Sequence, residues 1–221
     1  MPAAVAPEIE VIIDDKHGGG GRDLPPVRRY GGGDDSKKGP NRRVSPTRYY
    51  TGIAIGIISV LMFFMALASA FLVRKGSADW VPVHIPTLLW FNTGVLLVSS
   101  GTLELARKRL ARADLLGFKR FWLITTVLGF VFLAGQVVAW RILVRQGIYL
   151  ASNPASSFFY IFTGAHGLHL LGGVGALIYV AKRNYDRAKI TRIVAAEITS
   201  YYWHFMDALW LFLLVLMYLG R

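Results

Sequence analysis

Two stretches in the last third of the chain decide the fold: residues 158–173 (FFYIFTGAHGLHLLGG) and residues 197–214 (EITSYYWHFMDALWLFLL). Each lies within an apolar run that is long enough to cross a lipid bilayer. Together they nevertheless contain three histidines, one aspartate and one glutamate. Ionisable side chains are costly in hydrocarbon, so we expect these to face other protein or water. They therefore mark the packed faces of membrane-spanning helices.

The composition of the whole chain is that of a membrane protein. Of its 221 residues, 54% are hydrophobic, and the mean hydropathy is +0.43. The absence of cysteine from the sequence excludes thiolate metal ligands, thiol nucleophiles and disulfides. The formal net charge is +12, but the basic residues lie between apolar runs and do not form one stripe. This placement favours a membrane protein, and nucleic acid is not an expected partner.

Five apolar runs predict an all-α, polytopic membrane protein with five transmembrane helices. At 1.5 Å per residue, a run of about 20–26 residues crosses a hydrocarbon core of about 30 Å. These helices form the expected transmembrane domain, residues 48–221, and their approximate bounds are 50–73, 86–106, 121–144, 158–181 and 195–220.

The distribution of basic residues predicts the orientation. Of the 25 Lys and Arg residues, 20 fall on one side of the five runs. The positive-inside rule then places the N-terminus in the cytoplasm and the C-terminus outside. Residues 1–47 are rich in Gly, Pro and mixed charges, so we expect a disordered cytoplasmic tail there. No apolar core follows the first methionine, and acidic residues are frequent, so neither a signal peptide nor a transit peptide is expected.

The buried polar residues fall on two helical faces at similar depth. His166 and His169 are three residues apart, and His204 lies seven residues after Glu197 and three before Asp207. The two histidines of the fourth helix and the His204–Asp207 pair lie about 13–18 Å from opposite membrane faces. Antiparallel packing would therefore bring them together near the midplane.

Three interpretations of this cluster stay open at the level of the residues. An interhelical hydrogen-bond network is favoured, because glycines along the fourth helix permit close approach. A metal or haem site is the second, since His and Asp are competent ligands. However, only three of the five histidines lie in predicted spans, which is few for a di-metal centre. A proton relay is the third, because His–Asp chains at the midplane suit one.

Other polar and aromatic residues in the spans have simpler expected roles. Asn92 and Gln136 are expected to form hydrogen bonds across helices. Trp122 and Trp140 fall near the predicted ends of the third helix, so we expect them in the aromatic belts at the membrane surfaces.

The motifs in these stretches resemble those of subunit III of haem–copper oxidases. The segment from Thr163 to His169 (TGAHGLH) resembles the family's TGxHGxHV signature, and residues 202–212 (YWHFMDALWLF) resemble its YWHFVDxVWLFL segment. Glu197 also falls where the family has a glutamate. The five predicted spans resemble the short bacterial form, which lacks the first two of seven helices. Further residues that match family motifs are Gly164, Tyr202, Trp203, Trp210, Gln136 and Asn92.

One position departs from the family pattern. The family commonly has a serine–glutamate pair early in this first helix, but here Ser59 is followed by Val60. Any proton-related role that belongs to the missing carboxylate is therefore not carried over.

The resemblance implies a non-catalytic subunit of a proton-pumping cytochrome c oxidase in the bacterial inner membrane. Haem and copper would belong to subunits I and II, so no catalytic, cofactor-binding or metal residue is expected in this chain. The implied partners are subunit I, subunit II and a possible subunit IV, together with structural phospholipids. Cytochrome c or quinol would be reached only through the complex. Alternatives are a quinol-oxidase subunit, a nitric-oxide-reductase-associated protein, a stand-alone proton channel or carrier, and an assembly factor.

Overall fold

The structure, a computed structural model, describes residues 46–82, 86–183 and 189–220. The expected tail, residues 1–47, lies outside the described residues except for its last two positions. His84 lies outside them as well.

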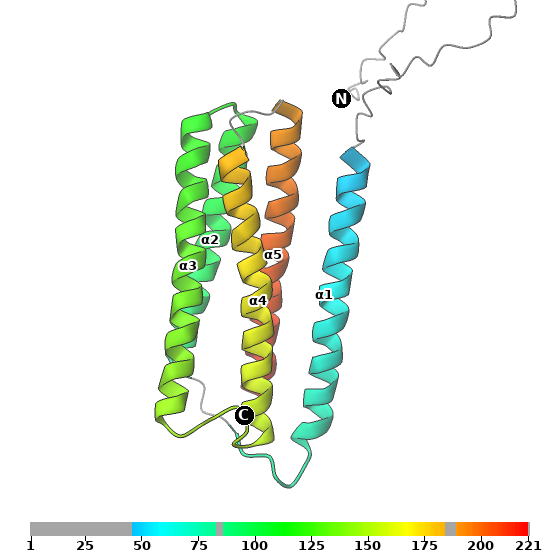
Figure 1. Cartoon of the computed structure of the whole chain (residues 1–221), viewed down its shortest axis with the longest axis vertical. Coiled ribbons are helices and arrows are strands. Elements are labelled where there is room, and N and C mark those ends of the chain that lie inside the picture. The colour runs from blue at the N-terminus through cyan, green and yellow to red at the C-terminus, as the bar shows by residue number, and fades with distance from the viewer. Residues whose placement is uncertain (1–45, 83–85, 184–188, 221) are drawn as a thin grey trace, which may run out of the picture. The chain divides into compact units, whose positions relative to one another are not determined.

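Five long helices follow one another along the described chain, each antiparallel to the one before it (Figure 1). All five are long and apolar enough to cross a membrane, and no strand occurs in the described ranges. This confirms the predicted all-α class with five membrane-spanning helices. Their bounds are α1 Pro46–Lys75, α2 Leu88–Ala111, α3 Leu115–Arg145, α4 Pro154–Arg183 and α5 Lys189–Leu219.

The helices extend beyond most of the apolar runs. The third, for example, begins at Leu115, six residues before its apolar run, and the fifth begins at Lys189. Charged side chains near a helix end can reach toward the headgroups while the backbone stays helical, so the apolar run marks the membrane-embedded part only.

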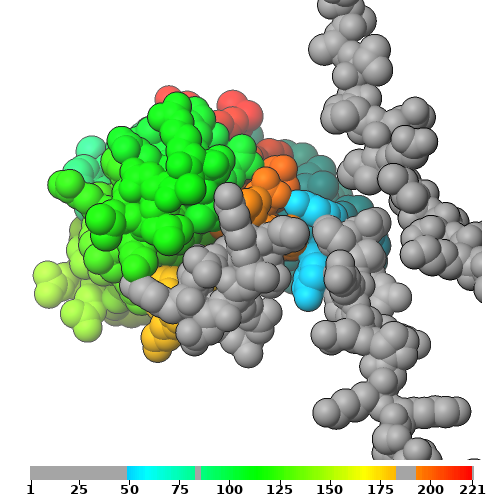
Figure 2. Space-filling model, turned by 90° about the horizontal axis from the view of Figure 1, so that it is seen from above, coloured from blue at the N-terminus to red at the C-terminus, as the bar shows by residue number. Residues whose placement is uncertain are grey.

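Four of the helices close into a ring. Each of α2, α3, α4 and α5 packs against two others, because α2 contacts α3 and α5, and α4 contacts the same two helices. In contrast, α1 lies outside this ring and packs only against α4 and α5 among the described helices. Seen from above, the described part of α5 lies between α2–α3 and the first residues of α1 (Figure 2).

The interior of the ring holds large aromatic side chains. Phe132, Trp203 and Trp210 are completely buried, and Trp122 is 1% exposed. The expected belt position of Trp122 at the membrane surface is therefore wrong. Its indole N–H donates to the carbonyl oxygen of Leu177 on α4 at 2.9 Å, which satisfies the donor inside the protein.

Contacts with α1 occur at both of its ends. Near its start, the Tyr50 hydroxyl donates to Glu197 Oε2 on α5 at 2.6 Å. At its other end, Nζ of the last residue, Lys75, donates to the Leu219 carbonyl oxygen at 2.5 Å. In the segment that follows, Trp80 Nε1 donates to the Gly220 carbonyl oxygen at 3.1 Å. These bonds tie both ends of α1 to α5.

The short connections between helices are fixed by capping side chains. Asp114 accepts a hydrogen bond from the Gly117 backbone N–H at 2.9 Å and so caps the start of α3. It also pairs with Arg109 of α2 at 3.0 Å. The Gly117 hydrogen bond and the Arg109 guanidinium hold the pKa of Asp114 below its ordinary value. At the start of α4, the side chains of Asn153 and Ser156 each accept from the other residue's backbone N–H.

Candidate functional site

His166 lies in the centre of the ring among aromatic side chains. It projects from α4 and is completely buried. Its ring centroid lies 5.0 Å from that of Trp210 on α5 and 6.0 Å from that of Phe132 on α3. Neither ring nitrogen has a hydrogen-bond partner among the described residues. His166 therefore joins α3, α4 and α5 by ring packing.

His169 lies one turn further along α4 but faces a different helix. Its Nδ1 is 2.7 Å from the carbonyl oxygen of Ala165 in the same helix, so Nδ1 carries the proton and donates. Its ring lies 5.6 Å from that of Phe64 and 6.2 Å from that of Phe63, both on α1. The hydroxyl of Tyr202 on α5 donates to the backbone oxygen of His169 at 3.0 Å. This residue belongs to the contact between α4 and α1.

His204 on α5 faces α2. Its Nδ1 lies 2.6 Å from Ser100 Oγ, a hydrogen bond between side chains 104 positions apart in the sequence. One residue before it, Trp203 donates to Ser99 Oγ at 3.0 Å. Two adjacent residues of α5 therefore bond to two adjacent hydroxyls of α2.

Asp207 is the buried carboxylate of the cluster. It is 4% exposed, and neither side-chain oxygen has a hydrogen-bond partner among the described residues. Asp207 and His166 are each twelve residues from the same end of the ring, counted from Leu219 and Pro154, which places both about 18 Å along the helices. They therefore lie at the same depth in the ring.

His166, His169, His204 and Asp207 thus lie at similar depths, whereas Glu197 lies ten residues before Asp207, about 15 Å nearer the start of α5. Three of the five have partners on helices outside the contact between α4 and α5. Glu197 bonds to α1, His169 packs against α1, and His204 bonds to α2. Within the described part of the chain, no hydrogen bond joins the histidines of α4 to His204 or Asp207. The polar residues therefore contact α1 and α2, and they do not form one hydrogen-bonded contact between α4 and α5.

Asn92 on α2 and Gln136 on α3 are both buried in the half of the ring where α2 begins and α3 ends. Asn92 packs against the backbone of Gly135, where a methyl group would overlap its amide. Asn92 Nδ2 and both polar atoms of the Gln136 side chain have no hydrogen-bond partner in the described ranges. The structure therefore places both residues in the interior, and the hydrogen bonds expected for Gln136 and for Asn92 Nδ2 are not formed within the described ranges.

Tryptophan donors join the helices of the ring, a role that the sequence analysis did not assign. Besides Trp203, Trp210 donates to Thr93 Oγ1 on α2, and Trp140 donates to Thr163 Oγ1 on α4, both at 3.0 Å. Thr163 also donates to the Phe159 carbonyl in its own helix at 2.8 Å. Trp203 and Trp210 are seven residues apart, a spacing that places them on one helical face and could have indicated a shared partner helix.

Across residues 46–82, 86–183 and 189–220, no group of three or more His, Asp or Glu side chains is arranged to hold a metal ion. The three histidines that the structure describes are instead engaged by rings, a backbone oxygen and a hydroxyl. The arrangement is one of helix packing through aromatic rings and single hydrogen bonds.

Comparison with known proteins identifies the family. The model of the family "Cytochrome c oxidase subunit III" matches residues 42–220. A probable cytochrome c oxidase subunit 3 of Nocardia farcinica is 35% identical over 185 residues, covering 80% of this chain and 90% of that protein. A probable cytochrome c oxidase subunit 3 of Mycobacterium tuberculosis is 33% identical with the same coverage. The cytochrome c oxidase subunit 3 of Thermostichus vulcanus is 32% identical, covering 76% and 85%. The chain therefore belongs to the cytochrome c oxidase subunit III family.

Proposed function

We propose that this chain is the non-catalytic subunit III of a proton-pumping terminal oxidase that reduces oxygen to water. The observation that carries the proposal is the family match over residues 42–220, which contains all five helices. The family motifs coincide with the helix-joining contacts: Trp203 and His204 bond to α2, and Trp210 bonds to Thr93. The motif residues thus build the fold of the subunit.

In this role the chain covers a flank of subunit I, holds structural phospholipids and supports proton uptake and stability during turnover. Haem and copper belong to subunits I and II, and the electron donor is cytochrome c, as the names of the relatives indicate. The five membrane-spanning helices support a location in the bacterial inner membrane. Ser59 bonds to the Ile55 carbonyl of its own helix at 2.9 Å, and Val60 follows it, so the proposal gives α1 no proton-carrying carboxylate at this position.

Purification of the tagged chain in mild detergent tests the proposal. Mass spectrometry should identify a haem-bearing subunit I and a copper-bearing subunit II in the same particle, and the particle should oxidise reduced cytochrome c. Oxidation of quinol but not of cytochrome c would correct the donor. A monodisperse chain without partner subunits would contradict the proposal.

A second test concerns the orientation, which the 20 basic residues on one side support. Because the chain has no cysteine, a single cysteine can be introduced without background labelling. A cysteine at Ala113, in the turn between α2 and α3, should be shielded from a membrane-impermeant maleimide in intact cells. One at Ser152, in the turn before α4, should be labelled. The opposite pattern would reverse the orientation.

One observation favours a candidate of a different class, a stand-alone proton channel or carrier. The buried Asp207 carboxylate lies inside the ring at the level of His166 without a protein hydrogen-bond partner among the described residues. Purified chain in liposomes should then dissipate a proton gradient, and Asp207→Asn should abolish the flux. Absence of flux from the wild-type chain would remove this candidate.

A further inference from the structure

The two halves of α1 are attached to the ring in different ways. In the second half, Phe71 is 3% exposed. Its ring lies 5.2 Å from that of Trp80, and 5.6 and 5.7 Å from those of Phe158 and Phe162 on α4. Lys75 and Trp80 add their hydrogen bonds to the end of α5. This end of α1 is therefore fixed by aromatic packing together with hydrogen bonds.

The middle of α1 is held by Phe64. This side chain is completely buried, and its ring lies 5.6 Å from that of His169 on α4. Phe64, Ala68 and Phe71 follow one another at intervals of four and three residues, so they lie on one face of the helix. Within residues 49–75, where exposure is described, these three side chains are the buried ones. Burial along α1 therefore begins at Phe64.

The first half of α1 continues the same face but does not bury it. Ile53, Ile57 and Val60 precede Phe64 at the same helical spacing, and each is only partly buried. Val60 packs against the core, whereas Ile53 and Ile57 do not take part in it. Near the start of the helix, the Tyr50 hydroxyl donates to a carboxylate of α5 at 2.6 Å. This half therefore has little apolar burial, and a hydrogen bond to the ring lies at its far end.

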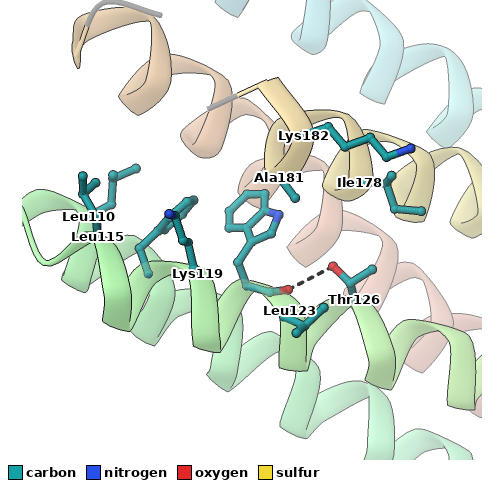
Figure 3. Close-up of a pocket in the computed structure, with 10 residues that line it drawn as sticks. Leu110, Leu115, Lys119, Leu123, Thr126, Ile178, Ala181 and Lys182 are labelled. Atoms are coloured by element: carbon teal, nitrogen blue, oxygen red, sulfur yellow. Dashed lines mark hydrogen bonds between the residues drawn. The ribbon is translucent and has the colours of Figure 1, made fainter. Parts of the chain in front are cut away.

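The last turns of α4 pack on a different side. Ala181 and Lys182 line a pocket of about 460 Å³ with side chains of α2 and α3, and no residue of α1 lines it in the described part of the chain (Figure 3). The Leu177 carbonyl accepts the indole N–H of Trp122 on α3. This end of α4 therefore packs toward α3, whereas His169, about two turns earlier, packs against α1.

We propose that the Tyr50–Glu197 hydrogen bond is a latch whose release lets the first half of α1 swing away from α5, with a pivot at Phe64. The pivot follows from the change in burial, because the helix is packed from Phe64 onward and sparsely packed before it. From Tyr50 to Phe64 the helix is about 21 Å long, so the bond acts at the end of a long arm.

The strength of such a bond suits a latch. A side-chain hydrogen bond between membrane helices changes an equilibrium about threefold on average and at most about 20-fold. The bond between Tyr50 and Glu197 therefore favours the closed position of α1 without making it permanent. The latch belongs to the helices of this chain and does not rest on the proposed function.

Distances between pairs of spin labels test the latch. The chain has no cysteine, so labels can be attached to introduced cysteines, and the unmodified complex gives the background from partner subunits. One pair, Ala54→Cys/Leu116→Cys, joins the first half of α1 to the start of α3. The other, Val73→Cys/Gln146→Cys, joins the end of α1 to the end of α3. All four side chains are exposed. Double electron–electron resonance on the purified complex measures both distance distributions.

Tyr50→Phe removes the hydroxyl and keeps the ring. We expect the fraction of longer distances in the first pair to rise about threefold to 20-fold, while the second pair keeps its distribution. Glu197→Ala removes the acceptor and should raise the same fraction. The matched control is Tyr49→Phe, which removes a hydroxyl from the neighbouring residue, whose side chain is 47% exposed. It should leave both distributions unchanged.

Three results would overturn the latch. The first is a change of less than about twofold in Tyr50→Phe, below the range for such bonds, or a change equal to that in Tyr49→Phe. The second is equal lengthening of both pairs, because α1 would then leave the ring as a whole. The third is an effect of Tyr50→Phe without one of Glu197→Ala, since the hydroxyl would then act through another partner. If the chain purifies without partner subunits, the same pairs are measured in the chain alone, so a failure of the proposed function remains distinguishable.

Discussion

His204 Nδ1 on α5 and Ser100 Oγ on α2 lie 2.6 Å apart and join two helices that are distant in the sequence. Beside them, Trp203 donates to Ser99. The two bonds close the ring between its first and last helices, since α2 and α5 have no connecting turn of their own. The side chains at this position therefore hold together a contact that the order of the chain does not enforce.

Loss of the His204–Ser100 bond should loosen the subunit without affecting the haems. Ser100→Ala should lower the stability of the chain by about 0.6 kcal/mol and by no more than about 1.7 kcal/mol, the range for such bonds within membranes. His204→Leu, which also changes shape, should reduce retention of the chain in the purified complex. Thermal release of the subunit, followed by size-exclusion chromatography, measures both effects.

Ser59→Ala is the matched control for Ser100→Ala, because the Ser59 hydroxyl bonds to the Ile55 carbonyl of its own helix and to no other helix in the described ranges. It should leave retention unchanged. Equal effects of the two alanine substitutions, or loss of haem absorbance in the His204→Leu complex with the subunit still bound, would contradict a packing role.

Replacing Trp210, which bonds to Thr93, should lower the stability of the chain more than replacing an exposed tryptophan. Trp210→Phe removes the donor and leaves the buried Thr93 hydroxyl without it, at an expected cost of about 1–3 kcal/mol. Trp90→Phe is the control, because Trp90 is 54% exposed on the same ring. In a double-mutant cycle with Thr93→Val, the double variant should lose less stability than the sum of the two single losses, because either single change already breaks the bond. Additive effects would show that the bond carries no coupling.

Close packing at Gly129 on α3 should not tolerate a side chain. A methyl group there would lie 2.8 Å from the Trp203 ring and 3.1 Å from Val174. Trp203 is completely buried and held by its bond to Ser99, so it has little room to shift. We expect Gly129→Ala to destabilise the chain by about 1–3 kcal/mol, as overpacking does.

Gly167 provides the control for this substitution, because no atom lies within 4 Å of a methyl group placed there. Gly167→Ala should be neutral, or stabilising by up to about 1 kcal/mol through helix propensity. Both variants are compared by their melting temperatures in detergent. A larger loss for Gly167→Ala than for Gly129→Ala would contradict the packing described for α3 and α5.

The cap at Asp114 should make the turn between α2 and α3 sensitive to acid. Its pKa is lowered from 3.8 in the folded chain, mainly by the Gly117 N–H and by Arg109. The stabilisation is therefore complete above pH 3.8 and is lost as the pH falls through the lower folded pKa. Asp114→Asn retains a capping oxygen but does not titrate, so its stability should depend less on pH below about 4. Melting curves between pH 3 and 7 measure this difference, and identical curves for both proteins would contradict it.

The sequence was sufficient to predict the five helices and the burial of some of their polar residues. Apolar runs identify membrane spans because hydrocarbon leaves the backbone few alternatives, and His166 and Asp207 are indeed buried. The partners of these residues were less predictable. Helical spacing shows which side chains share a face, but not which neighbouring helix lies opposite: His169 packs against α1, whereas His204 bonds to α2.

Trp122 shows a second limit of the sequence. A tryptophan near the end of an apolar run suits both the membrane surface and the interior, since its ring is apolar and its N–H needs one acceptor. Only the approach of α4 supplies that acceptor, the Leu177 carbonyl. The burial of Trp122 therefore depends on tertiary packing that no local pattern encodes.

The position of α1 outside the ring has a consequence for the history of the family. The contacts that close the ring run among α2 to α5, whereas α1 adds Phe63, Phe64 and the two end contacts from one side. A helix that precedes the ring can therefore change without a compensating change in the hydrogen bonds that join α2 to α5. Insertions and deletions should therefore be more frequent before α2 than within α2 to α5. There, the bonds of Trp203 and His204 to Ser99 and Ser100 fix the alignment of the helices.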